Sequence, residues 1–115
     1  MLKFEKLKEN RDFKRIYYRG KAAVCPYFVL YSMKGRVGKI RLGITAGKAL
    51  GGAVQRNRAK RIITAAFRNV CPNIPLGYDF VVVARVRILK SKSTELAQIM
   101  EKQLKAGGIW YEESR

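Results

Sequence analysis

Residues 13–78 contain no acidic side chain, although fourteen lysines and arginines lie between Lys14 and Arg68. Any compact fold must therefore carry these like charges without carboxylates from the same stretch to balance them. All eight acidic residues lie nearer the two ends, and the formal net charge is +17. Self-repulsion of this size destabilises a compact state, so the charge predicts a polyanionic partner. A merely basic, soluble protein is the plainer alternative, but an ordinary surface interleaves both signs of charge.

Length and composition fit a single domain covering residues 1–115. A chain of 115 residues with 48% hydrophobic side chains can bury a core of its own. It has no apolar run long enough to cross a membrane and no signal peptide at its start, so we expect a cytoplasmic protein without a membrane partner. Cys25 and Cys71 have neither a Cys-x-x-Cys pair nor a histidine to complete a zinc site, which favours buried, reduced thiols.

The N-terminal part predicts a short amphipathic helix. Asn10 can cap this helix, which carries Phe13, Ile16 and Tyr17 on one face and ends at about residue 19. Gly20 would then supply a left-handed stop.

Strands are expected after this helix. Residues 27–33 are rich in aromatic and β-branched side chains, and residues 40–46 alternate in polarity. Because turn-forming residues 34–38 separate these two segments, we expect an antiparallel hairpin. Pro26 limits pairing where it stands and could set off a short additional strand around residues 21–25.

The longest predicted helix covers residues 53–68, which contain neither proline nor glycine. At about 100° per residue, its side chains fall into two groups. The packing side holds Gln55, Ala59, Ile62, Ile63, Ala66 and Phe67. The opposite side holds Asn57, Arg58, Lys60, Arg61, Thr64 and Arg68. One face of this helix should therefore pack on a core, while the other is cationic.

The remaining segments complete an α/β (α+β) two-layer sandwich. Residues 78–84 contain a continuous apolar run typical of a central strand, and Ser93 can cap a last helix that runs through Leu104. The expected order is αβββαβα, with three helices and about four strands, the long helix connecting two neighbouring strands. The sequence alone does not decide the handedness of that crossover.

The cations of the long helix indicate the kind of partner. Like charges at helical spacing cost roughly 0.2–0.5 kcal/mol per pair, and no acid on this helix relieves them. Arginine binds phosphate oxygens in bidentate fashion, and Asn57 can donate and accept hydrogen bonds, so an RNA backbone would satisfy this face. A face that meets only water is the structural alternative. Gly51 and Gly52 add a weak phosphate signal, but they form neither a Walker loop nor a dinucleotide fingerprint.

Residues 48–61, KALGGAVQRNRAKR, resemble the signature of the bacterial ribonuclease P protein, KxxGxAVxRNRxKR. The likeness extends to residues 10–20, 27–31 and 78–85. It implies an α/β sandwich with a left-handed crossover through the long helix, whose side chains face the catalytic RNA subunit. The residues expected in this contact are Lys48, Arg56, Asn57, Arg58, Lys60, Arg61 and, on the same helix, Arg68. The family often carries further cations where Ala49 and Thr64 stand, which implies a weaker RNA contact at these turns.

The resemblance also implies a cleft for the single-stranded 5′ leader of precursor tRNA, between the first helix and the open face of the sheet. The residues expected there are Phe13, Lys14, Tyr17, Phe28 and Tyr31. Aromatic rings stack on bases of any sequence, worth about 1–3 kcal/mol per base, although ordinary core packing explains each ring about as well. Alternate strand residues face opposite sides, so Phe28 and Tyr31 cannot share a cleft without a bulge, and we favour Phe13, Tyr17 and Tyr31.

The chain offers no catalytic site of its own. It lacks histidine, and no carboxylate lies between Asp12 and Asp79, so we expect neither a general acid and base nor a metal-binding carboxylate cluster. Glu112 and Glu113 are adjacent, but in the tail they are expected to be solvated charges. The resemblance implies that the RNA subunit cleaves, with Mg²⁺ held mainly by RNA, and that one copy of this protein assists it as a subunit of an endoribonuclease.

Two other classes of protein share some of these features. A structural ribosomal RNA-binding protein has similar size, charge and architecture, and it would bind ribosomal RNA without stimulating leader removal. A DNA-binding module is disfavoured, because the basic helix follows a strand and glycines rather than a first helix and a tight turn.

Overall fold

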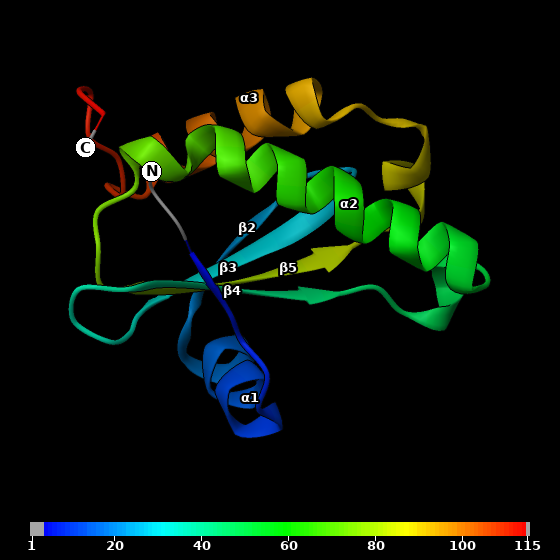
Figure 1. The fold of residues 1–115 in the computed structure, drawn as a ribbon, viewed down its shortest axis with the longest axis horizontal. Helices are drawn as coiled ribbons and strands as arrows, with labels where there is room; N and C mark the ends of the chain where they lie inside the picture. Colours follow the sequence, from blue (N-terminus) through cyan, green and yellow to red (C-terminus); the bar gives the residue numbers. More distant parts are fainter. Residues whose placement is uncertain (1–3, 115) are drawn as a thin grey trace.

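The computed structural model describes residues 4–114, which form a five-stranded mixed sheet with helices on both faces. Figure 1 shows α2 and α3 on one face of the sheet and α1 on the other, an α+β arrangement. In chain order the strands and long helices are β1 (Glu5–Lys6), α1 (Asn10–Arg19), β2 (Lys21–Val24), β3 (Phe28–Lys34), β4 (Ile40–Thr45), α2 (Ala53–Val70), β5 (Tyr78–Ala84) and α3 (Ser93–Ala106). Three short 3-10 helices are η1 (Lys48–Leu50), η2 (Cys71–Asn73) and η3 (Val86–Lys90).

The expected fold class and order of elements are confirmed, with one strand more than the four expected. The additional strand is β1, which pairs in parallel with β4 through Glu5 and Lys6. Both residues are charged and exposed, so this segment shows none of the apolar alternation that marks a strand in a sequence.

The predicted hairpin between β3 and β4 is wrong, because β5 lies between them. The strand order is β1-β4-β5-β3-β2, with β5 antiparallel to β3 and parallel to β4. The turn after β3 sets the direction of the next strand but does not make the two strands neighbours. The run of apolar residues in β5 is buried at the centre of the sheet, where both edges of its backbone find partners.

Two expectations about strand connections hold. Helix α2 joins the neighbouring parallel strands β4 and β5, and the left hand of this crossover stays a prediction. The short strand near Pro26 is also present as β2, which pairs with β3 in a tight hairpin. The Cys25 amide donates to the Phe28 carbonyl oxygen at 3.0 Å and closes this turn.

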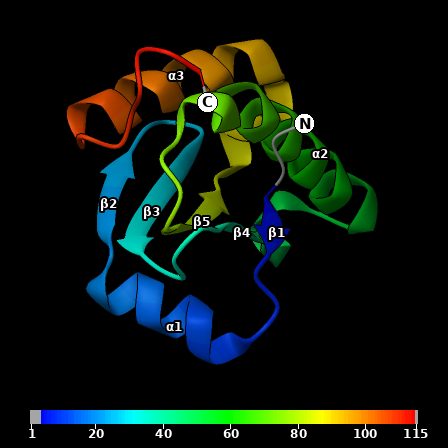
Figure 2. The same ribbon diagram turned by 60° about the vertical axis from the view of Figure 1, so that its left-hand side comes forward.

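The sheet separates a large core from a small one. The large core lies under α2 and α3 and includes Phe28, Phe67 and Phe80. The small core lies under α1, where Ile16 packs with Val81 of β5. Figure 2 shows α1 as the single helix on that side of the sheet. The small core is therefore the part of the interior on which the placement of α1 depends.

Helix α2 has the two faces that its sequence predicts. Ala59, Ile63, Ala66 and Phe67 are buried, and Ile62 is half-buried. Gln55 is an exception, because it is exposed and its side-chain oxygen accepts the Gly52 amide at 3.0 Å. A polar residue in the first turn of a helix can accept hydrogen bonds from the unpaired amide groups there, and it then does not pack on the core.

The predicted helix ends need correction. Asn10 and Ser93 are the first helical residues, while Glu9 and Lys92 stand at the cap positions. Gly20 is extended, with φ of −74°, so it is not a left-handed stop. A Cβ atom there would lie 2.5 Å from the Ile16 carbonyl oxygen and 3.0 Å from that of Ser32, so the position needs a glycine for close approach.

The cysteines and the C-terminal segment lie close to the core. Cys71 is buried, whereas Cys25 is only half-buried and its thiol donates to the Phe28 carbonyl oxygen. After α3, the Asn73 side chain donates to the Tyr111 carbonyl oxygen at 2.7 Å, and the Tyr111 amide donates to the Asn73 carbonyl oxygen at 2.8 Å.

None of the helices formed by residues 4–114 has both the length and the hydrophobicity that a membrane crossing requires.

Candidate nucleic-acid interface

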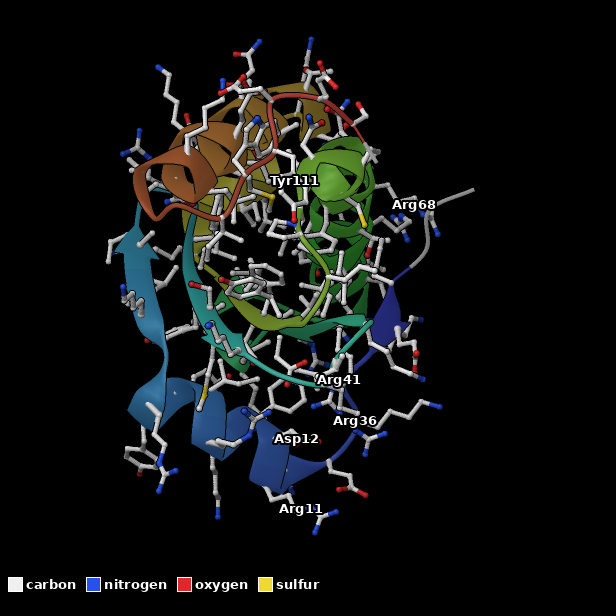
Figure 3. The ribbon with its side chains drawn as sticks, turned by 90° about the vertical axis from the view of Figure 1, so that its left-hand side faces the viewer. Arg11, Asp12, Arg36, Arg41, Arg68 and Tyr111 are labelled. Carbon is white, nitrogen blue, oxygen red and sulfur yellow. The ribbon has the colours of Figure 1, made fainter. Side chains whose placement is uncertain are left out.

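The first part of the candidate interface is the cationic face of α2, together with the neighbouring η1. The side chains predicted to contact RNA lie on these two elements. They are Lys48 on η1 and Arg56, Asn57, Arg58, Lys60, Arg61 and Arg68 on α2. All of them are exposed except Arg56, which is half-buried. Figure 3 shows Arg68 projecting outward from α2, away from the core. Within residues 4–114, none of these six cations forms an ion pair with a carboxylate.

Several basic residues outside α2 are, in contrast, neutralised inside the protein. Arg15 and Arg41 both contact Asp79, and Lys39 lies 2.8 Å from Glu5. Some cations of the carboxylate-free middle of the sequence are therefore paired. Their partners include Asp12 and Asp79, which lie just outside that stretch of the sequence. The face of α2 is where unpaired positive charge concentrates.

The start of α2 offers less to a phosphate than the paired glycines suggested. The Gly52 amide already donates to Gln55, and the Arg56 Nε donates to the Gly52 carbonyl oxygen at 3.4 Å. The side chains of Arg58, Lys60 and Arg61, which point to solvent further along the helix, are thus the stronger candidates for phosphate contact.

A second part of the interface is the aromatic cluster of Phe13, Tyr17 and Tyr31. The ring centroids of Tyr17 and Tyr31 lie 5.2 Å apart in an edge-on contact, and those of Phe13 and Tyr17 lie 6.4 Å apart. All three side chains are half-buried, and the Tyr17 hydroxyl forms a hydrogen bond with Thr45. The structure therefore brings together the three favoured residues, and each keeps part of its surface exposed. Lys14 is exposed on the same helix.

The placement of Phe28 in this cleft is wrong. Phe28 is wholly buried, at 0% exposure, in the large core on the other side of the sheet. Strand β3 pairs with β5 residue by residue without a bulge, so Phe28 and Tyr31 face opposite sides. The period-two argument is confirmed, and Phe28 is a core residue.

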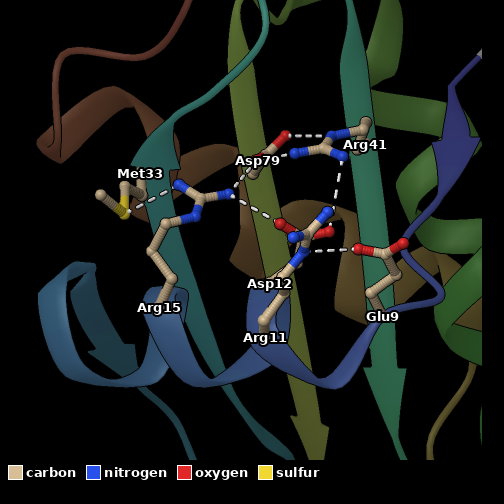
Figure 4. Close-up of polar contacts among 7 residues, drawn as sticks. All are labelled: Glu9, Arg11, Asp12, Arg15, Met33, Arg41 and Asp79. Atoms are coloured by element: carbon tan, nitrogen blue, oxygen red, sulfur yellow. Dashed lines mark hydrogen bonds and ion pairs between the residues drawn. The ribbon is translucent and has the colours of Figure 1, made fainter.

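An ion-pair network fixes α1 to the sheet beneath this cluster, and sequence reasoning missed it. Asp79 of β5 accepts hydrogen bonds from Arg15 of α1 at 2.6 Å and from Arg41 of β4 at 2.8 and 2.6 Å (Figure 4). Asp12 of α1 lies 3.7 Å from each of these arginines. The Asp79 side chain is 1% exposed, so α1 contributes an arginine to a buried charge.

The two arginines keep Asp79 ionised. Burial alone would raise the pKa of Asp79, but the hydrogen bonds from Arg41 and Arg15 outweigh burial and hold the pKa below its ordinary value. The hydrogen bond to Asp79 likewise raises the pKa of Arg41. The sequence places Asp79 beside the apolar run of β5, and a carboxylate that is buried with such a run needs a partner.

No constellation for hydrolysis is evident among the side chains of residues 4–114. No three His, Cys, Asp or Glu side chains in this part of the chain gather closely enough to hold a metal ion. The carboxylate oxygens of Asp79 are already bonded to arginine. The geometry suits the binding of a polyanion across α2 and of unpaired bases near α1.

Comparison with known proteins identifies the family. The sequence profile of the family Ribonuclease P matches residues 1–107. The ribonuclease P protein component of Caldanaerobacter subterraneus subsp. tengcongensis is 36% identical over 113 residues, covering 98% of this chain and 97% of the relative. That of Clostridioides difficile is 41% identical over 81 residues, covering 70% of this chain and 71% of the relative.

Solved structures agree with the sequence relatives. The RNase P protein of Thermotoga maritima has a TM-score of 0.76 at 31% identity, covering 89% of this chain and 96% of that one. A Staphylococcus aureus RNase P protein mutant with defective mRNA degradation activity has a TM-score of 0.78 at 33% identity, covering 91% and 89% of the two chains. This chain therefore belongs to the ribonuclease P protein component family.

Proposed function

We propose that this chain is the RNA-binding subunit of ribonuclease P, and that it holds the catalytic RNA through the cationic face of α2. The observation that carries the proposal is the set of exposed cations on η1 and α2 that lack carboxylate partners within residues 4–114. Each such cation that meets a phosphate releases counterions, which favours binding to a folded RNA. Family membership favours this partner over ribosomal RNA.

The aromatic cluster of α1 and β3 would hold the 5′ leader of precursor tRNA. Phe13, Tyr17 and Tyr31 are neighbours on the side of the sheet that carries only α1, and Lys14 adds a charge for the backbone. Partly exposed aromatic edges and faces suit single-stranded RNA, since stacking on them does not depend on base identity. The protein would thus bind both the ribozyme and its substrate.

The chemistry would reside in the RNA. Magnesium ions bound mainly by RNA would supply the nucleophile for leader hydrolysis, while this protein reduces repulsion between two polyanions and positions the leader. We further propose that one protein copy acts per RNA, in the cytoplasm. Purified protein incubated with precursor tRNA and magnesium should then cleave nothing, and cleavage that persists after removal of contaminating RNA would disprove this division of labour.

Binding is tested by competition at fixed salt concentration. Labelled catalytic RNA of the same organism is mixed with the protein and challenged with ribosomal RNA of equal length or with duplex DNA. The proposal expects the catalytic RNA to be retained at competitor concentrations that exceed its own by about a hundredfold, because specific binding is typically tighter than non-specific binding by roughly a thousandfold or more. Equal displacement by ribosomal RNA would contradict it.

The leader contact is tested with two substrates. The affinity of the protein–RNA complex for precursor tRNA should exceed its affinity for mature tRNA, and Tyr31→Ala should reduce this difference by about fivefold or more, as expected for loss of one stacked base. Tyr111→Ala is the matched control, because Tyr111 is exposed and lies at the C-terminal end, far from α1 (Figure 3). A Tyr31→Ala complex that still prefers the precursor as strongly would rule out stacking on this ring.

A further inference from the structure

A groove runs along the β1 edge of the sheet. The proposed function gives this groove no role. Its volume is about 870 Å³, which is within the range of small-ligand pockets. One wall is the middle and C-terminal part of α2, with Lys60, Thr64 and Arg68, and the opposite wall includes Phe13 of α1. The groove therefore lies between the two parts of the interface described above.

The groove exists because β1 is too short to cover its neighbour. Pairing with β4 ends at Leu42, where the Leu7 amide donates to the Leu42 carbonyl oxygen at 3.0 Å. Within residues 4–114, no strand covers this edge of β4 over residues 43–45. The floor left open is apolar and is made by Phe4, Leu7, Leu42 and Ile44. The Phe4 ring packs edge-on against Phe67, with centroids 4.8 Å apart, which ties this part of the floor to the large core.

The rim of the groove is positively charged. Lys6 stands on the β1 side, and Lys60 and Arg68 stand on the α2 side, while none of the described residues that line the groove is acidic. Thr64 also lines the groove, and its hydroxyl already donates to the Lys60 carbonyl oxygen at 2.7 Å within the helix. An apolar floor under a cationic rim matches a nucleotide, whose base is flat and weakly polar and whose phosphates are anionic.

We infer that this groove receives an unpaired base of the RNA partner, with the flanking phosphates bound by Lys60 and Arg68. The inference rests on the proposed function and adds a site to it, at which RNA would continue from α2 toward α1. An apolar protein segment is the competing occupant, but it would gain nothing from three cations around the rim. The charge therefore favours RNA.

The occupant is tested by nuclear magnetic resonance of the methyl groups in the full chain. The probe is an RNA tetranucleotide of adenylate residues, compared with the same backbone carrying abasic residues. The base-bearing probe should cause ring-current shifts in the methyl resonances of Leu7, Leu42 and Ile44, and the abasic probe should not. Leu104 of α3 serves as a remote reference. Equal effects of both probes, or no shifts in the groove, would overturn the inference.

A groove-filling variant tests the same site without removing charge. Thr64→Trp places an indole in the groove and should weaken binding of the adenylate probe by about fivefold or more. Thr94→Trp, on the exposed side of α3, is the matched control and should leave the affinity unchanged.

The groove and the proposed function can fail separately. If Thr64→Trp binds the probe as well as the unmodified chain while the complex still processes precursor tRNA, only the groove is excluded. If the unmodified protein does not bind catalytic RNA at all, the proposed function fails and the groove inference with it.

Discussion

At the scale of single residues, the buried carboxylate of Asp79 links α1 to the sheet. It is the one acidic group in the sheet that bonds to arginines from two different elements, Arg15 of α1 and Arg41 of β4, among residues 4–114. A buried ion pair adds little net stability over an apolar substitute, but removing one partner leaves the others buried and uncompensated. The network therefore acts as a constraint on geometry, holding the aromatic residues of α1 against β3.

Replacing Asp79 should test this constraint directly. Asp79→Asn leaves Arg41, whose side chain is 12% exposed, with only Asp12 at 3.7 Å as a counter-charge among residues 4–114, and should lower the free energy of unfolding by about 3 kcal/mol. Urea unfolding at pH 7 measures the loss. Glu101→Gln is the control, since it breaks an exposed pair with Lys105 and should change little. Equal losses in both variants would contradict the assigned role.

The pH dependence of the free energy of unfolding should show the contribution of the Asp79 ion pairs. The pKa of Asp79 is lowered in the folded protein, so its contribution is complete above the ordinary value of 3.8 and is lost as the pH falls through the lower folded value. The stability gap between the unmodified chain and Asp79→Asn should therefore be constant near neutral pH and shrink in acid. Thermal unfolding across this range measures it, and a gap that persists far below pH 3.8 would count against the ion pair.

The number of cations on η1 and α2 that contact phosphates should be measurable from the salt dependence of RNA affinity. If the six cations of η1 and α2 each meet one phosphate, the logarithm of RNA affinity should fall with the logarithm of salt concentration at a slope of about −5. Arg58→Ala or Arg61→Ala should each flatten the slope by about one unit. Lys102→Ala, an exposed cation of α3, is the control and should leave the slope unchanged. Slopes that do not differ would show that α2 is not the contact.

At the scale of elements, the position of α1 depends on how closely it approaches β4. The Phe13 ring lies over Gly43, where an added Cβ atom would come within 2.6 Å of it. Only a glycine allows this contact, because nothing but a hydrogen atom stands between the β4 backbone and the ring.

Gly43→Ala should therefore displace α1 without touching α2. We expect weaker discrimination between precursor and mature tRNA, while affinity for the catalytic RNA stays the same. Gly47→Ala is the matched control, since a Cβ atom there meets nothing within 4 Å. Parallel measurements of both affinities decide the matter, and a variant that loses catalytic RNA binding instead would show that α1 and α2 do not act separately.

The helices and strands could be predicted where the pattern that defines them lies within a short stretch of sequence. The two faces of α2 follow from helical periodicity, and the central position of β5 follows from its apolar run. The pairing of β3 with β5 rather than with β4 was not predictable in this way, because it depends on a strand more than forty residues further along the chain. Gly20 was misread for a similar reason, since one of the contacts that requires it is the carbonyl oxygen of Ser32 on another strand.

At the scale of the whole molecule, the distribution of charge matters more than its sum. The sequence predicted the cationic face of α2, and the structure leaves all of those side chains except Arg56 exposed. It did not predict that Asp12 and Asp79 would neutralise Arg15 and Arg41, because contacts between distant segments cannot be read from composition. The 25 lysines and arginines thus include some that are neutralised inside the fold and others that stand exposed on α2.

The most direct test of this account is the rate at which cognate catalytic RNA removes the 5′ leader from precursor tRNA at moderate magnesium. We predict that the unmodified protein stimulates this rate and that the double variant Arg58→Gln and Arg61→Gln, added at the same concentration, does not. A double variant that stimulates cleavage as strongly as the unmodified protein would contradict the claim that α2 binds the catalytic RNA.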